Sequence, residues 1–376
     1  MQFRDLHAQY EALKPEIDAG IARVIDSTAF ILGKPVAELE EQLAAYAGRK
    51  HCVCVANGTE ALQLSLMAMD VGPGDAVFTS NFTYFASAGC ASIIGATPVL
   101  VDVELESFNM SPAALEKAIG KTIAEGELRP RVIIPVDLFG LPANYPEIEK
   151  IARKYGLAIL EDAAQGFGGR IGARVACSFG EMSATSFFPA KPLGCYGDGG
   201  AIFTDDPAVD ARLRSLRASG KSPEDKYDNR EIGMNSRLDT LQAAILLPKL
   251  RAFADYELEA VNAAAARYTA ALKGRVVTPA VPEGWLSSWA QYTILLESRE
   301  KRDVVQKTLK EKGIPTMVYY PRGLHQQAAY KAMALRDEDY PNTVEATRRV
   351  LSLPIHPYLK ESDQDMVVES LLEALK

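Results

Sequence analysis

The sequence predicts an α/β protein with a mostly parallel, mixed sheet between helices, followed by a smaller α+β domain. Between residues 36 and 162, strands alternate with amphipathic helices, and these strands are apolar along their whole length. Strands of this kind are typical of parallel sheets that helices cover on both faces. After about residue 237 the strict alternation is lost. We therefore expect a large domain with an N-terminal helical segment at 1–250 and a small C-terminal domain at 251–376.

The expected elements of the large domain follow one another through short turns. Helical periodicity at 36–47 stops at Gly48, and a later helix has Ser111 as its N-cap and Pro112 at its first position. The residues near 121–130 are expected to form an extra loop. Strands are expected at 51–55, 76–79, 98–102, 131–136 and 157–162, and the helices between them at 57–67, 85–94, 111–119 and 145–155.

The small domain is expected to begin with one long helix. Residues 238–272 are rich in alanine and leucine, and Pro248 is expected to kink this helix. The elements expected after it are a strand near 290–296, a helix near 300–312, a strand near 314–320, and helices near 341–351 and 361–375.

Composition excludes several classes of function. The net charge of −8 and a pI near 5.3 argue against nucleic acid as a partner, because phosphate binding needs a basic face. No apolar run is long enough to span a bilayer, and the N-terminus has no signal-peptide pattern. Five cysteines and four scattered histidines give no metal-ligand spacing. We expect buried reduced thiols, a cytoplasmic protein and no metal site.

The loop around Lys191 is the first candidate for chemistry. Lys191 lies between Pro189 and Pro192, and glycines follow it at 194, 197, 199 and 200. Prolines restrict the backbone and glycines allow tight turns, so this amine stands on a constrained loop. Such a lysine is a candidate nucleophile that forms a Schiff base with a carbonyl or with pyridoxal phosphate. From this segment alone, a surface lysine in a glycine-rich turn is equally consistent.

Two further candidates follow strands of the predicted sheet. Asp162 ends an apolar strand, where it could accept a hydrogen bond from a protonated pyridine nitrogen, or form with Glu161 a solvent-facing pair. Gly58 and Thr59 lie where a strand passes into a helix, a position that suits a phosphate or a simple helix cap. No dinucleotide-binding glycine fingerprint is present, which argues against a nicotinamide enzyme.

The last two candidate site residues are an aromatic residue and an arginine. Tyr84 could stack on a cofactor ring, or pack in the core as we expect for Phe82 and Phe85. Arg237 follows an irregular stretch, and could hold a carboxylate with two hydrogen bonds or form a structural salt bridge.

Taken together, these segments resemble the DegT/DnrJ/EryC1/StrS family of pyridoxal-phosphate-dependent nucleotide-sugar aminotransferases, which have fold type I. The resemblance covers essentially the whole chain. It is carried by five motifs in the family's order and spacing, at 57–62, 161–165, 186–194, 197–200 and 235–239.

The resemblance implies a role for each matching residue. Lys191 would hold the cofactor and move the proton between cofactor and substrate. Asp162 would pair with the pyridine nitrogen, and Gln165 would lie against the phenolic oxygen. Tyr84 would stack on the ring. The phosphate would be held by Gly58, Thr59 and Ser186, and by Asn235 from a neighbouring subunit, because family members are homodimers with shared active sites.

The chain resembles most the 3-aminotransferases of UDP-2-acetamido-2-deoxy-3-oxo-glucuronate, in which Arg237 would bind a carboxylate of the sugar or of glutamate. It departs from the family pattern at one place. The family usually has His-Tyr-Pro followed by Pro-Leu-His, and this chain has Tyr319-Tyr320-Pro321 and then Gly323-Leu324-His325. Tyr319, Tyr320 and His325 are expected to bind substrate. Tyr319 removes a possible cation, which bears on whether the sugar carries a carboxylate.

The implied reaction moves an amino group from L-glutamate to a keto carbon of a UDP- or dTDP-linked sugar, on the way to lipopolysaccharide O-antigen. Two alternatives stay open. One is a C4 aminotransferase of a 4-keto-6-deoxy nucleotide sugar, and the other is a pyridoxal-phosphate-dependent sugar dehydratase. Some dehydratases of the family carry histidine at the position of Lys191, so the lysine disfavours that branch.

Overall fold

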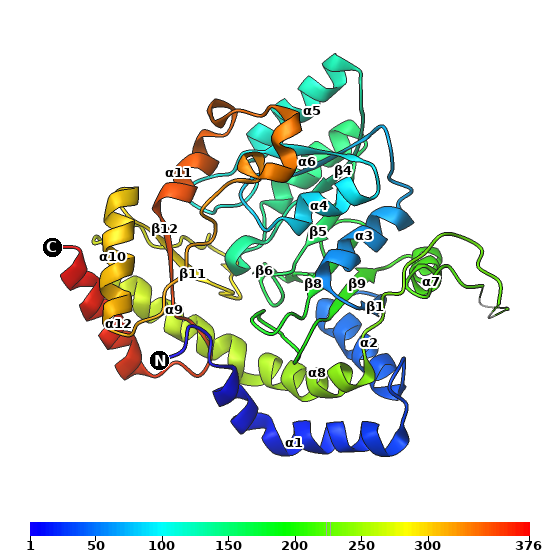
Figure 1. The fold of residues 1–376 in the computed structure, drawn as a ribbon, viewed down its shortest axis with the longest axis horizontal. Coiled ribbons are helices and arrows are strands. Elements are labelled where there is room, and N and C mark those ends of the chain that lie inside the picture. The colour runs from blue at the N-terminus through cyan, green and yellow to red at the C-terminus, as the bar shows by residue number, and fades with distance from the viewer. Residues whose placement is uncertain (223, 226) are drawn as a thin grey trace.

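The computed structural model describes residues 1–222, 224–225 and 227–376, and Figure 1 shows its course. A seven-stranded sheet in the described part of the chain has the order β1-β9-β8-β5-β4-β2-β3. Strand β9 runs antiparallel to both of its neighbours, and the other pairs are parallel, so the predicted mixed, mostly parallel sheet is confirmed. The bounds are β1 His51–Val55, β2 Asp75–Ser80, β3 Thr97–Val101, β4 Arg129–Ile134, β5 Ala158–Asp162, β8 Met182–Ser186 and β9 Gly200–Thr204.

Helices cover both faces of this sheet, as the apolar strands predicted. Val77 of β2 packs in a cluster with residues of α3, α4 and α7, whereas its neighbour Phe78 packs in another cluster with residues of α5 and α6. Successive side chains of a strand point to opposite faces, so both faces are buried. The helices of this part are α1 Leu6–Ser27, α2 Lys34–Ala47, α3 Gly58–Ala68, α4 Ala86–Ile93, α5 Pro112–Glu125, α6 Tyr145–Tyr155 and α7 Pro207–Leu216.

Helix α5 begins as predicted and ends later than predicted. The Ser111 hydroxyl accepts a hydrogen bond from the Ala114 N–H, and Pro112 lies in the first turn. The extra loop expected at 121–130 is wrong, because the helix continues to Glu125 and β4 begins at Arg129. The buried Thr122 extends the apolar face by one more turn, and Gly126 then closes the helix with a φ of 70°.

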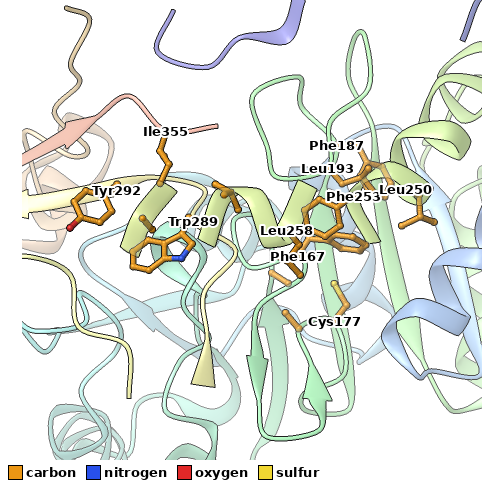
Figure 2. Packing of buried hydrophobic residues seen from close by; sticks show 14 of the residues in the cluster. Phe167, Cys177, Phe187, Leu193, Leu250, Phe253, Leu258, Trp289, Tyr292 and Ile355 are labelled. Carbon is orange, nitrogen blue, oxygen red and sulfur yellow. The ribbon is translucent and has the colours of Figure 1, made fainter. Parts of the chain in front are cut away.

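The long helix that follows is interrupted five residues after Pro248. Helix α8 (Thr240–Ala252) passes through a π-helical turn, η2 (Phe253–Glu257), into α9 (Leu258–Leu272). Pro248 itself lies inside α8, so the irregularity is not at the proline. Figure 2 shows Phe253 and Leu258 of this long helix among other buried residues of one large cluster. In this view Phe167, Phe187 and Leu193 lie around them, and Trp289, Tyr292 and Ile355 lie to their left.

The C-terminal part is built on a small antiparallel sheet. Strand β11 (Tyr292–Leu295) pairs with β12 (Val350–Leu353), and the predicted strand near 314–320 is wrong. In that segment only Met317 pairs with a strand, through an isolated bridge to Ser352, since Pro315 lacks a backbone donor. The helices are α10 Arg299–Glu311, α11 Pro341–Arg349 and α12 Glu361–Ala374, with short 3-10 turns η3 Leu324–Gln326, η4 Ala328–Met333 and η5 Asp337–Asp339.

Smaller elements complete the fold. Strands β6 (Arg170–Ile171), β7 (Arg174–Val175) and β10 (Trp285–Leu286) form a second small sheet, and η1 (Leu138–Gly140) is one 3-10 turn. The five cysteines are free and buried, as predicted. Among the described residues, no helix combines the length and the apolar character that a membrane crossing needs.

Candidate active site

The candidate site lies at one edge of the seven-stranded sheet. Strands β1, β2, β5 and β8 run parallel within the sheet order, so their carboxyl ends meet at the same edge. Open α/β sheets bind ligands at this edge. Asp162 is the last residue of β5, and Gly58, Tyr84 and Lys191 follow the ends of β1, β2 and β8.

Lys191 stands on a turn after β8. Its backbone N–H donates to the Phe188 carbonyl at 2.8 Å, which closes the turn, and its side chain is half-buried. Burial lowers the pKa of the Lys191 amine; the carboxylate of Asp162 opposes this shift and the positive charge of Arg4 adds to it, with a net pKa of about 8. A surface lysine would keep its ordinary pKa, so the structure favours the nucleophile among the two interpretations of this loop.

A second buried lysine shows that the pKa alone does not identify the site. Burial also lowers the pKa of Lys249 to about 8. Its amine, however, donates to the Gly194 carbonyl and lies over the Tyr196 ring. Lys249 therefore supports the turn that carries Lys191, whereas the Lys191 amine has no hydrogen bond among the described residues.

The lowered pKa of Lys191 predicts a pH dependence of the amine's reactivity that can be measured without turnover. In cofactor-free protein the neutral amine should predominate above about pH 8, whereas an ordinary lysine remains protonated up to its pKa of 10.5. Competitive labelling with an acylating reagent, followed by peptide mass spectrometry, should give a midpoint near pH 8 for Lys191. Lys150, which is exposed and pairs with Glu147 at the surface, is the control. Equal midpoints for the two lysines would contradict the assignment.

Asp162 is buried at the end of β5 and faces the same edge. The Ser87 hydroxyl donates to its Oδ2 at 2.7 Å, and the Ala164 N–H donates to its Oδ1 at 3.2 Å. Burial raises the pKa of Asp162, although both hydrogen bonds and the charge of Lys191 favour the carboxylate. The solvent-facing pair with Glu161 is wrong, because both side chains are buried.

Glu161 has a structural role on the opposite face of β5. Its carboxylate accepts hydrogen bonds from the N–H groups of Cys177 and Phe179 at 2.7 and 2.8 Å, and from the Ser183 hydroxyl at 2.7 Å. It thereby ties the segment after β7 to the sheet beside β8. Of the two neighbouring carboxyl groups, only Asp162 is directed towards Lys191 and Ser87.

The start of α3 forms an anion cradle. The Asn57 side chain accepts a hydrogen bond from the Glu60 N–H at 2.8 Å, so the cap is present and the N–H groups of Gly58 and Thr59 stay outside the helix's own bonds. A Cβ at Gly58 would lie 2.6 Å from the Cβ of Ser186, and one at Gly200 would lie 2.6 Å from the Asn57 carbonyl group. Both glycines are therefore needed to bring the Ser186 hydroxyl close to these two N–H donors, an arrangement that fits a phosphate.

Gln165 and Tyr320 are joined across the two parts of the chain. The Gln165 side chain donates to the Tyr320 hydroxyl at 3.1 Å and accepts from the Phe139 N–H at 2.8 Å. Burial raises the pKa of Tyr320, so its hydroxyl stays neutral and can itself donate a hydrogen bond. Tyr84 is 59% exposed, so it is not packed in the core as Phe82 is, and the core position expected for Phe85 is wrong, because that side chain is exposed too. The ring of Tyr84 is free to stack on a ligand.

The other predicted substrate-binding residues are placed differently. Tyr319 is half-buried, with its ring edge-on to Phe3. His325 is buried, and its two ring nitrogens lie 2.7 Å from the Asn81 amide and 3.0 Å from an Asp337 oxygen. Both nitrogens are thus engaged, and His325 fixes the loop beside the end of β2. That arrangement leaves it no free nitrogen for a substrate.

Asn235 and Arg237 flank Ser236, whose hydroxyl accepts a hydrogen bond from the Ala56 N–H at 3.1 Å, beside the start of the cradle. Asn235 is exposed and pairs with Ala218 through an isolated bridge, and Arg237 is half-buried. Among the described residues, no acidic side chain lies within 4.0 Å of Arg237, so the structural salt bridge weighed for it is absent there. In the described part of the chain, neither residue forms a side-chain hydrogen bond or ion pair with Lys191 or Asp162.

Sequence reasoning missed two residues of the site. Ser87 donates to Asp162 across 75 positions, and the Arg4 side chain donates to the Pro192 carbonyl across 188 positions. Ser87 lies three residues after Tyr84, so its place at the same edge could have been inferred. No local pattern places Arg4 at the site.

A large cavity elsewhere contains none of the predicted site residues. It has a volume of about 840 Å³ and lies where β4, β5 and β8 begin, at the opposite edge of the sheet. Its lining includes Arg131, Glu181 and Asp205. Lys191 and the cradle at Gly58 lie at the carboxyl edge instead, and the chemistry is assigned there.

Three features of that edge together fit pyridoxal phosphate. The cradle at Gly58, Thr59 and Ser186 suits the phosphate, the buried carboxylate of Asp162 suits a protonated pyridine nitrogen, and the amine of Lys191 suits an aldehyde. All three lie at or just after strand ends of one sheet, so a single ligand can reach them.

Comparison with known proteins gives one family over nearly the whole chain. The model of the DegT/DnrJ/EryC1/StrS aminotransferase family matches residues 11–372. A UDP-2-acetamido-2-deoxy-3-oxo-D-glucuronate aminotransferase of Pseudomonas aeruginosa is 43% identical over 372 residues, covering 99% of each chain. A UDP-N-acetyl-3-dehydro-alpha-D-glucosamine 3-aminotransferase of Acidithiobacillus ferrooxidans is 39% identical, covering 95% of this chain and 93% of its own.

Solved structures agree with this comparison. The fold matches a DegT/DnrJ/EryC1/StrS aminotransferase from Brucella abortus with a TM-score of 0.96 and 48% identity, over 99% of this chain and 98% of that one. It also matches a Bacillus subtilis protein with bound cofactor PMP, with a TM-score of 0.86 and 27% identity, over 96% and 81% of the two chains. PMP is the aminated form of pyridoxal phosphate.

Proposed function

Because the chain belongs to the DegT/DnrJ/EryC1/StrS aminotransferase family and is a pyridoxal-phosphate-dependent nucleotide-sugar transaminase, we propose that it aminates C3 of UDP-2-acetamido-2-deoxy-3-oxo-glucuronate with L-glutamate as donor. The observation that carries the proposal is the placement of Lys191 and Asp162 at the edge that holds the anion cradle. The Pseudomonas relative, whose name states this substrate, supports the choice of sugar.

When bound, pyridoxal phosphate supplies an aldehyde that takes up an amino group and a ring that withdraws electrons from the substrate carbon. The protein supplies the rest. Asp162, held by Ser87 and the Ala164 N–H, places a negative charge in a buried position where a pyridinium proton would be stabilised. Gly58, Thr59 and Ser186 orient the phosphate.

Lys191 is assigned the proton transfers. With its pKa lowered to about 8, its amine can both take a proton from a substrate carbon and return it near neutral pH. The turn closed by Phe188 and the flanking prolines restricts where the amine can reach. A general acid–base of this kind works best when its pKa lies close to the operating pH.

Three further assignments belong to the proposal. Asn235 is exposed, together with the apolar Tyr84, Phe188 and Ile232, and this suits a homodimer in which Asn235 reaches the partner's phosphate. Sedimentation of the holoenzyme should then give twice the chain mass of 40.9 kDa. Arg237 would bind a carboxylate. The free, buried cysteines suit a cytoplasmic enzyme of O-antigen assembly.

One observation favours a second candidate sugar. Tyr319 stands where the family usually has a histidine, and the Acidithiobacillus relative is named for a sugar without the uronate carboxylate. UDP-2-acetamido-2-deoxy-3-oxo-glucose, the neutral sugar, is therefore the competing acceptor.

The test separates these sugars from one another and from other reactions. Purified yellow holoenzyme should lose its visible absorbance when L-glutamate is added, and an acceptor should restore it. The acceptors to compare are the 3-keto uronate, the neutral 3-keto sugar and a dTDP-linked 4-keto-6-deoxy sugar. We expect the fastest recovery with the 3-keto uronate. Sugar turnover without glutamate consumption would indicate a dehydratase, and an absorbance that glutamate leaves unchanged would refute transamination.

A further inference from the structure

The N-terminal segment before α1 forms a bridge next to Lys191. The ring of Phe3 lies edge-on to Tyr319, with centroids 6.3 Å apart, and the Arg4 side chain donates to the carbonyl of Pro192 at 3.2 Å. Pro192 directly follows Lys191. Figure 1 shows the N-terminus close to the C-terminal part of the chain. Residues 3 and 4 thus join the nucleophile's loop to the segment where this chain departs from its family.

The guanidinium of Arg4 is short of a negative partner. Among the described residues it has no acidic oxygen within 4.0 Å. The acid whose charge acts on it is Glu257, and the oxygens of Glu257 already accept two hydrogen bonds from the Gln9 amide and one from the Tyr358 hydroxyl. The Asp5 carboxylate is engaged at the start of α1, where it accepts from the Ala8 N–H at 2.9 Å.

Arg4 carries a positive charge at neutral pH, whereas its neighbour His356 does not. Burial lowers its pKa to about 10, which still leaves it a cation at neutral pH. Burial and the charge of Arg4 lower the pKa of His356 to about 4, so His356 is neutral there. A half-buried cation with one carbonyl acceptor is costly unless an anion completes its shell. Its planar fork matches a carboxylate.

We propose that Arg4 binds a carboxylate of the substrate beside Lys191 and so supplies the cation that Tyr319 does not. This inference rests on the proposed function for the identity of the substrates, each of which carries a carboxylate: the uronate at C6 and L-glutamate at its two ends. Arg4 then determines specificity, since it favours acceptors and donors that carry this group.

Binding of unreactive ligands to the holoenzyme tests the proposal apart from turnover. UDP-glucuronate and UDP-glucose differ only by the C6 carboxylate, and glutarate represents the carboxylates of glutamate. Titration calorimetry should compare these ligands on the native protein, on Arg4→Gln, on Arg4→Lys and on Arg23→Gln. Arg23 lies on α1 at a distance of about 26 Å along the helix from Leu6, so it is a matched loss of charge away from the site.

The expected result is selective for carboxylates. Arg4→Gln should weaken binding of UDP-glucuronate or of glutarate by about tenfold or more, as befits a charge-assisted pair, and leave UDP-glucose unchanged. Arg4→Lys should keep part of that affinity, and Arg23→Gln all of it. Loss with UDP-glucuronate alone identifies the sugar as the source of the carboxylate, and loss with glutarate alone identifies the amino donor.

Two results would overturn the role of Arg4. One is an unchanged affinity for both carboxylate ligands in Arg4→Gln. The other is an equal loss for UDP-glucose and UDP-glucuronate with none for glutarate, which would show a general effect on the fold of the segment. A protein that discriminates these ligands through Arg4 and yet does not transaminate would refute the proposed function and leave this inference standing.

Discussion

Replacing Lys191 with alanine should reduce glutamate-dependent amination by at least about three orders of magnitude, because the general acid–base and the nucleophile are lost together. The turn itself should survive, since its hydrogen bond to Phe188 uses the backbone N–H of residue 191. Single-turnover measurements of glutamate consumption give the rate, and circular dichroism verifies the fold.

Lys150→Ala is the matched control for this variant. Lys150 is exposed on α6 and pairs with Glu147, so its loss should leave the rate unchanged. A Lys191→Ala protein that turns over at the native rate would remove Lys191 from the mechanism.

Replacing Asp162 with asparagine should lower the rate by about a hundredfold or more while the protein still folds. Asparagine keeps the size of the side chain and can still accept from Ser87, but it removes the buried negative charge that the pyridinium proton requires. The reaction should lose kcat rather than affinity for glutamate, since the charge acts on the transition state. Steady-state kinetics with saturating cofactor separate the two parameters.

Asp365→Asn on the exposed face of α12 provides the control for that substitution. Asp365 pairs with Arg267 at the surface, so the same chemical change there should leave kcat unaltered. If Asp162→Asn retained native kcat and lost only affinity for the nucleotide sugar, Asp162 would be a substrate-binding residue instead.

The sequence could predict those site residues that lie at or near the ends of strands. Asp162 is the last residue of β5, and Gly58 follows β1 after two residues. Once the apolar strands predict a parallel sheet, the edge at which these residues meet follows from topology. The glycine spacing around Lys191 likewise predicts a constrained turn from local stereochemistry.

The remainder depends on contacts between distant segments. The pairing of Ser87 with Asp162 and of Arg4 with Pro192 arises from packing that no local pattern encodes. The hydrogen bonds of His325 with Asn81 and Asp337 could not be predicted either, because the sequence shows the histidine but not its partners. The end of α5 was missed for a simpler reason: Gly126, rather than Gly120, terminates that helix.

Transfer of nitrogen from labelled glutamate tests the central claim most directly. The holoenzyme is incubated with ¹⁵N-L-glutamate and UDP-2-acetamido-2-deoxy-3-oxo-glucuronate, and the products are examined by mass spectrometry and NMR. We predict one ¹⁵N at C3 of the sugar for each 2-oxoglutarate formed, and none with Lys191→Ala. Consumption of the keto sugar without incorporation of ¹⁵N would contradict the account.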